Sequence, residues 1–259
     1  MSVTQNSRND AEIEVRLPEA AADLEQGEEW YEVVVDGEAR RIGFHDYATT
    51  YAMPGIYEHL FYEELKCDSP RTVCALLGEH LEQDDRRPED LRVLDVGAGN
   101  GMVGEQLQEL GVDQIVGVDI IEEAAQAVER DRPGVYDDYH VVDLTAMPAP
   151  TQEELIARQF NCMVSVAALG FDDIPPDAFA QAYNMVESGG LVGLSIKEEM
   201  VSGEDSSGFS RLIDEGVSSG ALEVKLEHRY RHRLKANGEP LYYLAMVGEK
   251  GSDLPVSSA

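Results

Sequence analysis

Three carboxylates stand where short apolar segments of the chain pass into loops. They are Asp95, Asp119 and Asp143. Short apolar runs of this kind are typical of parallel strands that are covered on both faces, so the three carboxylates are expected at one edge of a sheet. There a carboxylate can accept hydrogen bonds from ribose hydroxyls or from an amino group. The pattern therefore predicts a binding site for a ligand that contains a nucleoside.

A glycine-rich loop follows the first of these carboxylates. Residues 97–101 read Gly-Ala-Gly-Asn-Gly, and apolar residues at helical spacing begin at Met102. Alternate glycines let the backbone turn sharply and place no side chains against a ligand. A strand, a bare loop and a helix N-terminus form a nucleotide-sized pocket at the carboxyl end of a parallel sheet.

Two classes of cofactor use this geometry. Gly99-x-Gly101-x-x-Gly104 satisfies the dinucleotide pattern G-x-G-x-x-G, which is a weak signal on its own. Asp95-x-Gly97-x-Gly99-x-Gly101 resembles the first motif of the class I S-adenosylmethionine-dependent methyltransferases. A carboxylate two residues before the first glycine would repel a pyrophosphate, whereas it suits a ligand that carries an ammonium and a sulfonium.

The resemblance implies a role for each residue of the predicted cofactor site. Asp119 would bind the ribose hydroxyls, and Ile120 would lie against the adenine face. Asp143 and the backbone of Leu144 would bind the adenine edge, and Val166 would lie beside the sulfonium. The expected S-adenosylmethionine-binding residues are Asp95, Gly97, Ala98, Gly99, Gly101, Asp119, Ile120, Asp143, Leu144 and Val166.

The resemblance also implies an α/β fold of Rossmann-like, class I methyltransferase type. This fold has a mostly parallel seven-stranded sheet, a C-terminal antiparallel hairpin and an N-terminal cap. The expected parts are a disordered acidic tail (1–27), an N-terminal hairpin with a helical cap (28–88), the S-adenosylmethionine-binding domain (89–250) and a flexible tail (251–259). The terminal hairpin, predicted around Asn237-Gly238, distinguishes this fold from dinucleotide dehydrogenases.

Aromatic residues are concentrated in the segment before the central strand. Tyr47 and Tyr51 are four residues apart, so they share one face of a predicted helix. Packing accounts for any single tyrosine, but the cluster favours a cap over the cofactor, because tyrosine combines a large apolar face with a polar tip. An oxygen acceptor would need a base, for which His45, Tyr47 and Tyr51 are the catalytic candidates.

The charge of the chain is strongly negative. Asp and Glu total 51 against 20 Lys and Arg, which gives a formal net charge of -31. Such a surface repels nucleic acids and anionic membranes, so neither is an expected partner. One segment is an exception, with Arg229, Arg231 and Arg233 beside His228 and His232. A solvated strand edge is the favoured interpretation of this segment, and a contact with an anionic substrate is the alternative.

No membrane, secretory or metal-binding signal is recognised. Residues 1–29 lack an apolar signal core, and the chain has no run of eighteen apolar residues. Cys67, Cys74 and Cys162 lack the spacing of a zinc site or a disulfide framework. We therefore expect a cytoplasmic protein without a metal, and the sequence does not indicate its oligomeric state.

These observations predict an enzyme that transfers a methyl group from S-adenosylmethionine to a small-molecule acceptor by in-line displacement. The fourth strand and its exit, residues 160–176, contain no Asn/Asp-Pro-Pro-Tyr/Phe and no Pro-Cys. By resemblance, this argues against methylation of base amines, of glutamine and of cytosine C5. Two alternatives remain open: an NAD-dependent oxidoreductase with a Rossmann domain, and a non-catalytic protein that binds the cofactor in a regulatory or scaffold role.

Overall fold

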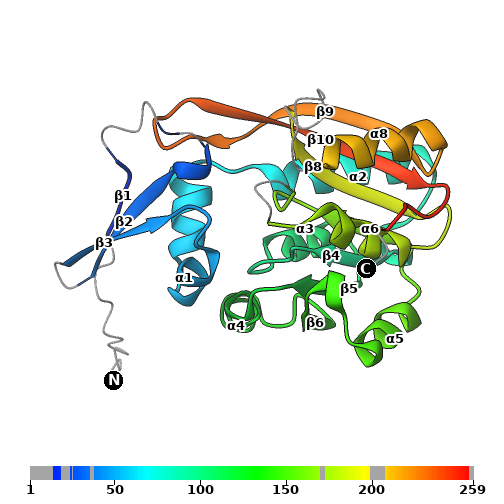
Figure 1. The fold of residues 1–259 in the computed structure, drawn as a ribbon, viewed down its shortest axis with the longest axis horizontal. Coiled ribbons are helices and arrows are strands. Elements are labelled where there is room, and N and C mark those ends of the chain that lie inside the picture. Colours follow the sequence, from blue (N-terminus) through cyan, green and yellow to red (C-terminus); the bar gives the residue numbers. More distant parts are fainter. Residues whose placement is uncertain are drawn as a thin grey trace, which may run out of the picture.

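A seven-stranded sheet forms the centre of the computed structural model, which describes residues 14–18, 24, 26–35, 38–169, 173–198 and 208–256. The strand order is β6-β5-β4-β7-β8-β10-β9 (Figure 1). The strands are β4 (Arg92–Val96), β5 (Gln114–Asp119), β6 (Asp138–Val141), β7 (Cys162–Ser165), β8 (Leu191–Lys197), β9 (Leu222–Leu234) and β10 (Pro240–Lys250). Neighbouring strands from β6 to β8 are parallel, and β10 is antiparallel to both β8 and β9. The predicted α/β fold with a C-terminal antiparallel hairpin is confirmed.

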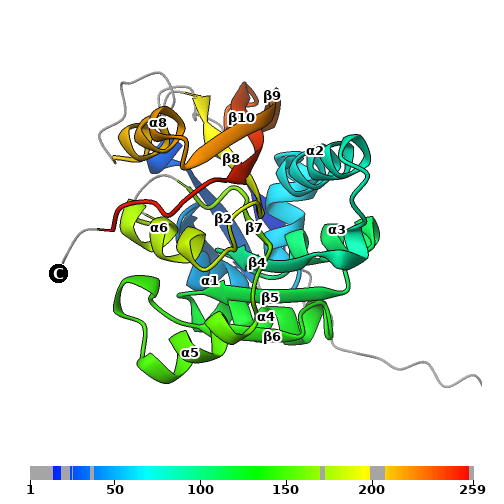
Figure 2. The ribbon, with the colours of Figure 1, turned by 90° about the vertical axis from the view of Figure 1, so that its right-hand side faces the viewer.

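Helices cover both faces of this sheet (Figure 2). On one face lie α2 (Ser69–Gln83) and α3 (Met102–Leu110), and on the other lie α5 (Ala149–Ala157), α6 (Pro176–Asn184) and α8 (Phe209–Ser219). The central strands are therefore buried on both sides, which explains their continuous apolar runs. In the described part of the chain, no helix combines the length and the apolar character needed to cross a bilayer.

A second, three-stranded antiparallel sheet stands beside the main sheet and belongs to the N-terminal segment. Its strands are β1 (Glu14–Arg16), β2 (Trp30–Val35) and β3 (Glu38–Gly43). The prediction of a disordered tail over residues 1–27 is thus wrong for residues 14–16. Residues 1–13 lie outside the described part. Main-chain hydrogen bonds to the open edge of β2 fix β1, and such bonds carry little sequence signal.

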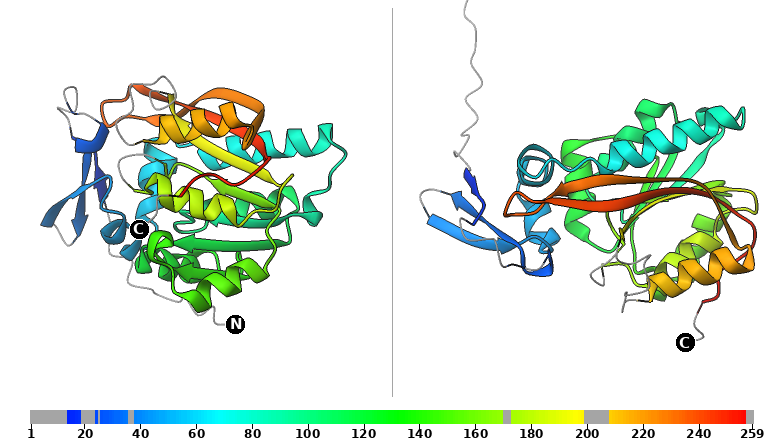
Figure 3. Two further views of the ribbon diagram at one scale, coloured as in Figure 1. Left: turned by 45° about the vertical axis from the view of Figure 1, so that its right-hand side comes forward. Right: turned by 90° about the horizontal axis from the view of Figure 1, so that it is seen from above.

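The cap continues through α1 (Tyr47–Ala52) and a π-helical segment (Glu58–Glu64) and shares an apolar core with the small sheet. The end of the β9–β10 hairpin reaches this cap, as two views show (Figure 3). There Arg233 forms a buried ion pair with Glu29 at 2.5 Å, and the N–H of Ala236 donates to the same carboxylate. Helix α2, which was predicted as part of the cap, packs on the main sheet instead.

The C-terminal segment is also more ordered than predicted. Leu254 is only 4% exposed and belongs to the main core. Its N–H donates to Asn184 Oδ1 at 2.8 Å, and its carbonyl accepts from Asn184 Nδ2 at 2.9 Å. The flexible tail predicted for residues 251–259 is therefore wrong at Leu254, because a side-chain amide and the core hold the backbone there.

Candidate active site

A cavity of about 350 Å³ lies between the carboxyl ends of the parallel strands and the cap. Both sides of the predicted site contribute to its wall. From the predicted cofactor set, the wall contains Gly97, Asp119, Ile120, Asp143, Leu144 and Val166. From the predicted catalytic set, it contains His45, Tyr47 and Tyr51. The structure thus brings together residues that were predicted separately, whereas Asp95, Ala98, Gly99 and Gly101 lie outside the lining.

Asp119 is held in place by backbone donors. Its Oδ2 accepts from the N–H of Gly99 at 2.8 Å, and its Oδ1 accepts from the N–H of Ile121 at 2.9 Å. A carboxylate has about four acceptor positions, so Asp119 can still accept from a hydroxyl group of a ligand. Ile120 is 60% exposed at the cavity wall, which makes it an apolar surface available to a flat ring.

Asp143 lies at the adjacent strand end. Its Oδ1 accepts from both the N–H and the hydroxyl of Thr145, at 2.8 and 2.7 Å, and these hydrogen bonds lower the pKa of Asp143. The carboxylate is therefore charged at neutral pH and lies at the cavity wall. Its position is compatible with the predicted contact to an amino group.

The glycine loop meets the cap at Gly99. A Cβ built on Gly99, whose φ is +53°, would lie 2.5 Å from the hydroxyl oxygen of Tyr51. The carbonyl of Gly99 accepts from the Tyr139 hydroxyl at 2.8 Å, so both polar backbone groups of this residue are fixed. Gly101, with φ +89°, is the N-cap of α3. Glycine at position 99 thus permits both the left-handed backbone and the approach of Tyr51.

Asp95 lies beneath the loop and is completely buried. Its Oδ2 accepts from the Tyr136 hydroxyl at 2.7 Å, and its Oδ1 has no hydrogen-bond partner among the described residues. Burial raises the pKa of Asp95 to about 7, so the carboxyl is partly protonated at neutral pH. Ala98 is buried beside it. A contact between Asp95 and the cofactor stays a prediction, because this side chain does not line the cavity.

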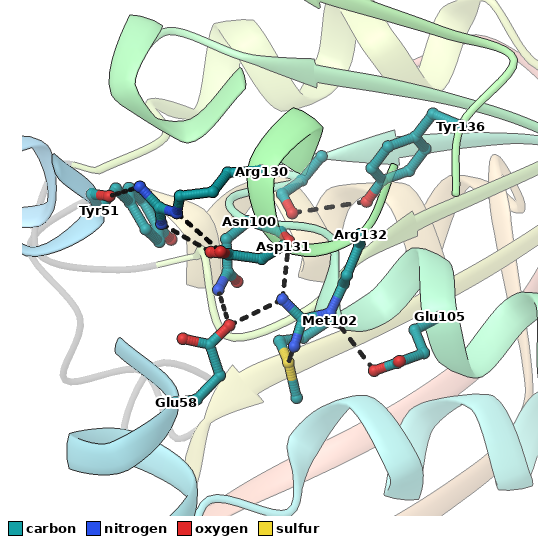
Figure 4. Close-up of polar contacts among 10 residues, drawn as sticks. Tyr51, Glu58, Asn100, Met102, Glu105, Arg130, Asp131, Arg132 and Tyr136 are labelled. Carbon is teal, nitrogen blue, oxygen red and sulfur yellow. Dashed lines mark hydrogen bonds and ion pairs between the residues drawn. The ribbon is translucent and has the colours of Figure 1, made fainter. Parts of the chain in front are cut away.

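A polar network connects the cap to the glycine loop (Figure 4). Glu58 Oε1 accepts from Asn100 Nδ2 at 2.7 Å and from Arg132 Nη1 at 2.8 Å. Arg130, near the end of helix α4 (Glu122–Asp131), donates to the carbonyl of Tyr51 at 3.1 Å. Sequence reasoning missed this network, since Glu58 is 74 residues from Arg132 and each occurs in an ordinary polar setting.

The predicted catalytic candidates differ in their chemistry. Burial raises the pKa of Tyr47 and of Tyr51 well above 10, so both phenols stay protonated at neutral pH and are poor bases. His45 Nδ1 lies 3.4 Å from Asp173 Oδ2 and 3.4 Å from the Tyr47 hydroxyl. A carboxylate beside an imidazole suits proton acceptance, so the geometry favours His45 among the three.

A second polar cluster lies away from the cavity. Candidate ligand atoms of Asp138, His140 and Glu154 lie within 4.8 Å of one another. Asp138 already forms an ion pair with Arg158, which accounts for its charge without a metal ion.

Comparisons with known proteins identify the family of this chain. Residues 67–236 match a family described as a methyltransferase domain, and no curated protein matches the sequence. A proposed RNA methyltransferase from Pyrococcus horikoshii has a similar structure, with a TM-score of 0.51 and 14% identity over 70% of this chain and 83% of its own. Magnesium protoporphyrin IX methyltransferase from Synechocystis PCC 6803, solved with S-adenosylmethionine, is also similar. Its TM-score is 0.48 and its identity is 12%, over 70% of this chain and 79% of its own. The family match covers more than half of the chain, which therefore belongs to the class I S-adenosylmethionine-dependent methyltransferases.

Proposed function

We propose that this protein transfers a methyl group from S-adenosylmethionine to a small-molecule acceptor held between the strand ends and the cap. The observation that carries the proposal is the cavity itself, which has Asp119, Ile120 and Asp143 on one wall and His45 and the tyrosines on the other. When bound, the cofactor supplies an electrophilic methyl group on a sulfonium. The chain's own residues then have to align an acceptor with that methyl group and exclude water.

Four side chains fit the cofactor, three in the wall of the cavity and one beneath the glycine loop. Asp119 keeps acceptor positions beyond its two backbone hydrogen bonds. Ile120 offers an exposed apolar face, and Asp143 offers a charged carboxylate one strand further along the sheet. Buried Asp95 has an unpartnered oxygen within the described structure, beneath the loop that would lie against the ligand.

The aromatic wall on the cap side of the cavity supports a small acceptor. Tyr47, Tyr51 and Tyr57 form a ladder of ring contacts, with centroids 6.1 and 4.8 Å apart, along the cap side of the cavity. This wall limits the size of an acceptor, and alignment within it can lower the barrier by roughly 7–11 kcal/mol. The net charge of -31 opposes a nucleic-acid substrate.

The proposal is tested by calorimetric titration with S-adenosylmethionine, S-adenosylhomocysteine and NAD. We expect micromolar binding of the first two, and loss of that binding in Asp119→Ala but not in Asp113→Ala, which alters an exposed carboxylate. Binding of NAD alone would overturn the proposal in favour of an oxidoreductase. Cofactor binding without methyl transfer to any of a broad panel of neutral, anionic and cationic acceptors would favour the scaffold role.

A further inference from the structure

A smaller chamber adjoins the cavity on its cap side. It has a volume of about 40 Å³ and shares part of its wall with the larger cavity, at His45, Tyr47, Tyr57, Ala167 and Asp173. Ala167 follows directly after Val166, the position predicted to lie beside the sulfonium. The chamber thus begins next to the place where an acceptor atom would meet the methyl group.

An unsatisfied amide lies in the wall of this chamber. Gln26 is only 8% exposed, and its Nε2 donates to the Tyr243 hydroxyl at 3.1 Å. Its Oε1 is buried and has no hydrogen-bond partner in the described parts of the chain. Leaving a buried acceptor unpaired costs about 1–3 kcal/mol, so this oxygen favours a ligand that donates a hydrogen bond.

The neighbouring imidazole is fixed and uncharged. His232 Nδ1 lies 2.6 Å from Ser69 Oγ, which in turn accepts from the Tyr230 hydroxyl at 2.6 Å. The ring of His232 stacks on Tyr243, with centroids 4.1 Å apart. Burial, aided by the charge of Arg233, holds the pKa of His232 well below its usual value. The interpretation of His232 as part of a solvated strand edge is therefore wrong.

The charge of the arginine in the wall is already paired. Arg233 Nη2 pairs with Glu29 at 2.5 Å, and its Nη1 donates to the carbonyl of Leu234 at 2.8 Å. The side chains of Arg233 and Glu29 are 4% and 2% exposed. An anionic group in the chamber would compete with the ion pair of Arg233 and Glu29 and would lose its own hydration, so an anionic acceptor is disfavoured in the chamber.

We propose that this chamber receives the hydrogen-bond-donating end of a neutral methyl acceptor, with Gln26 Oε1 as the receiving atom and His232 as part of the wall. The inference rests on the proposed methyltransferase function and names the class of its acceptor: an uncharged molecule with a hydroxyl or N–H group. A water molecule needs roughly 10–15 Å³, so a chamber of this size admits only a few heavy atoms. The remainder of the acceptor extends into the shared part of the cavity, along the rings of Tyr47 and Tyr57.

The test uses three probes of similar shape, added to the full chain saturated with S-adenosylhomocysteine. Phenol is neutral and donates, anisole is neutral and cannot donate, and benzoate is an anion. Binding is followed by nuclear magnetic resonance of the histidine rings, with His232 as the reporter and His228, exposed on the same strand, as the control. We expect phenol to shift the resonances of His232 but not those of His228, and to bind at least about fivefold more tightly than anisole or benzoate.

Variants identify the receiving atom. Gln26→Leu should weaken phenol binding at least about fivefold while S-adenosylhomocysteine binds as before, and Gln126→Leu, at an exposed position on α4, should change neither. Equal phenol binding by Gln26→Leu, or benzoate binding as tight as that of phenol, would overturn the proposal. Should Gln26→Leu not fold, the phenol-to-anisole ratio in the unaltered protein decides. Absence of S-adenosylhomocysteine binding would instead contradict the proposed function.

Discussion

The contact between Gly99 and Tyr51 makes the junction of the loop and the cap directly testable. We predict that Gly99→Ala weakens both the fold and the cofactor site, because the new Cβ would lie 2.5 Å from the Tyr51 hydroxyl oxygen. No real Cβ tolerates that distance, so either the tyrosine or the loop has to move. The next atom of the same side chain, Cζ, would lie at 3.4 Å, which is an ordinary contact.

The expected loss has two sources. A non-glycine residue in the left-handed region costs roughly 1–2 kcal/mol, and overpacking of a buried contact adds roughly 1–3 kcal/mol. Gly220→Ala is the matched control, because Gly220 has φ +77° and a Cβ at this position would meet no atom within 4 Å. Gly220→Ala should therefore lose only the roughly 1–2 kcal/mol that a non-glycine residue costs in the left-handed region.

The assay is urea unfolding combined with a double-mutant cycle. Tyr51→Phe removes the clashing oxygen, so Gly99→Ala should cost about 1–3 kcal/mol less in the Tyr51→Phe background than in the unaltered protein. The affinity for S-adenosylhomocysteine should follow the same order, since the loop and the cap both adjoin the cavity. An unchanged slope of free energy against urea would confirm that only stability has changed.

One outcome refutes the reasoning. If the effects of the two substitutions add to within about 0.5 kcal/mol, Tyr51 and Gly99 do not interact, and the cap does not close on the loop as described. A loss in Gly220→Ala equal to that in Gly99→Ala would likewise assign the whole effect to backbone conformation.

Two further predictions concern buried charge. The pKa of Asp95 is about 7 in the folded protein against an ordinary value near 3.8, so the native carboxyl keeps a proton that the unfolded chain loses. Stability should therefore fall by about 3 kcal/mol as pH rises from about 4 to 7. Asp95→Asn should remove that slope in pH-dependent urea unfolding, whereas exposed Asp113→Asn should retain it; a slope that persists in the first variant contradicts the assignment. Glu29→Gln leaves Arg233 buried without its counter-charge and should lower the stability by about 3–5 kcal/mol. Glu223→Gln removes an exposed ion pair and should lower it by under about 1 kcal/mol. Similar losses of stability for the two variants in thermal unfolding would show that the buried ion pair stabilises the fold no more than an exposed one.

Much of the main sheet and half of the site could be predicted from the sequence, because their signals are local. The strand, glycine loop and helix around Asp95 follow one another without a break, and each carboxylate marks its own strand end. Because the strands are parallel, Asp119 and Asp143 come to the same edge of the sheet without any contribution from distant parts of the chain. The cap side was predictable only as an aromatic cluster, since periodicity shows which residues share a face but not what that face meets.

The chamber behind the cavity was beyond sequence reasoning for a physical reason. Gln26 and Tyr243, which line it together, are 217 residues apart, and no periodicity connects them. Arg233 was interpreted as part of a solvated edge, because the partner that allows its burial, Glu29, lies 204 residues away. Buried polar residues are identified by their partners, and partners this distant are known only once the fold is known.

The architecture couples the two halves of the site. The proposed cofactor side is built from the loop and strand ends, whereas the proposed acceptor chamber is built mainly from the cap and the end of the β9–β10 hairpin. Glu58 connects the cap to Asn100 in the loop, and Tyr51 lies directly on Gly99. We predict that a ligand held at the loop also restrains the cap through these contacts, so acceptor and cofactor should each raise the affinity for the other by the same factor. Phenol should accordingly bind more tightly with S-adenosylhomocysteine than without it, and Glu58→Gln should reduce that difference; equal phenol affinity in both states would show that the halves act independently.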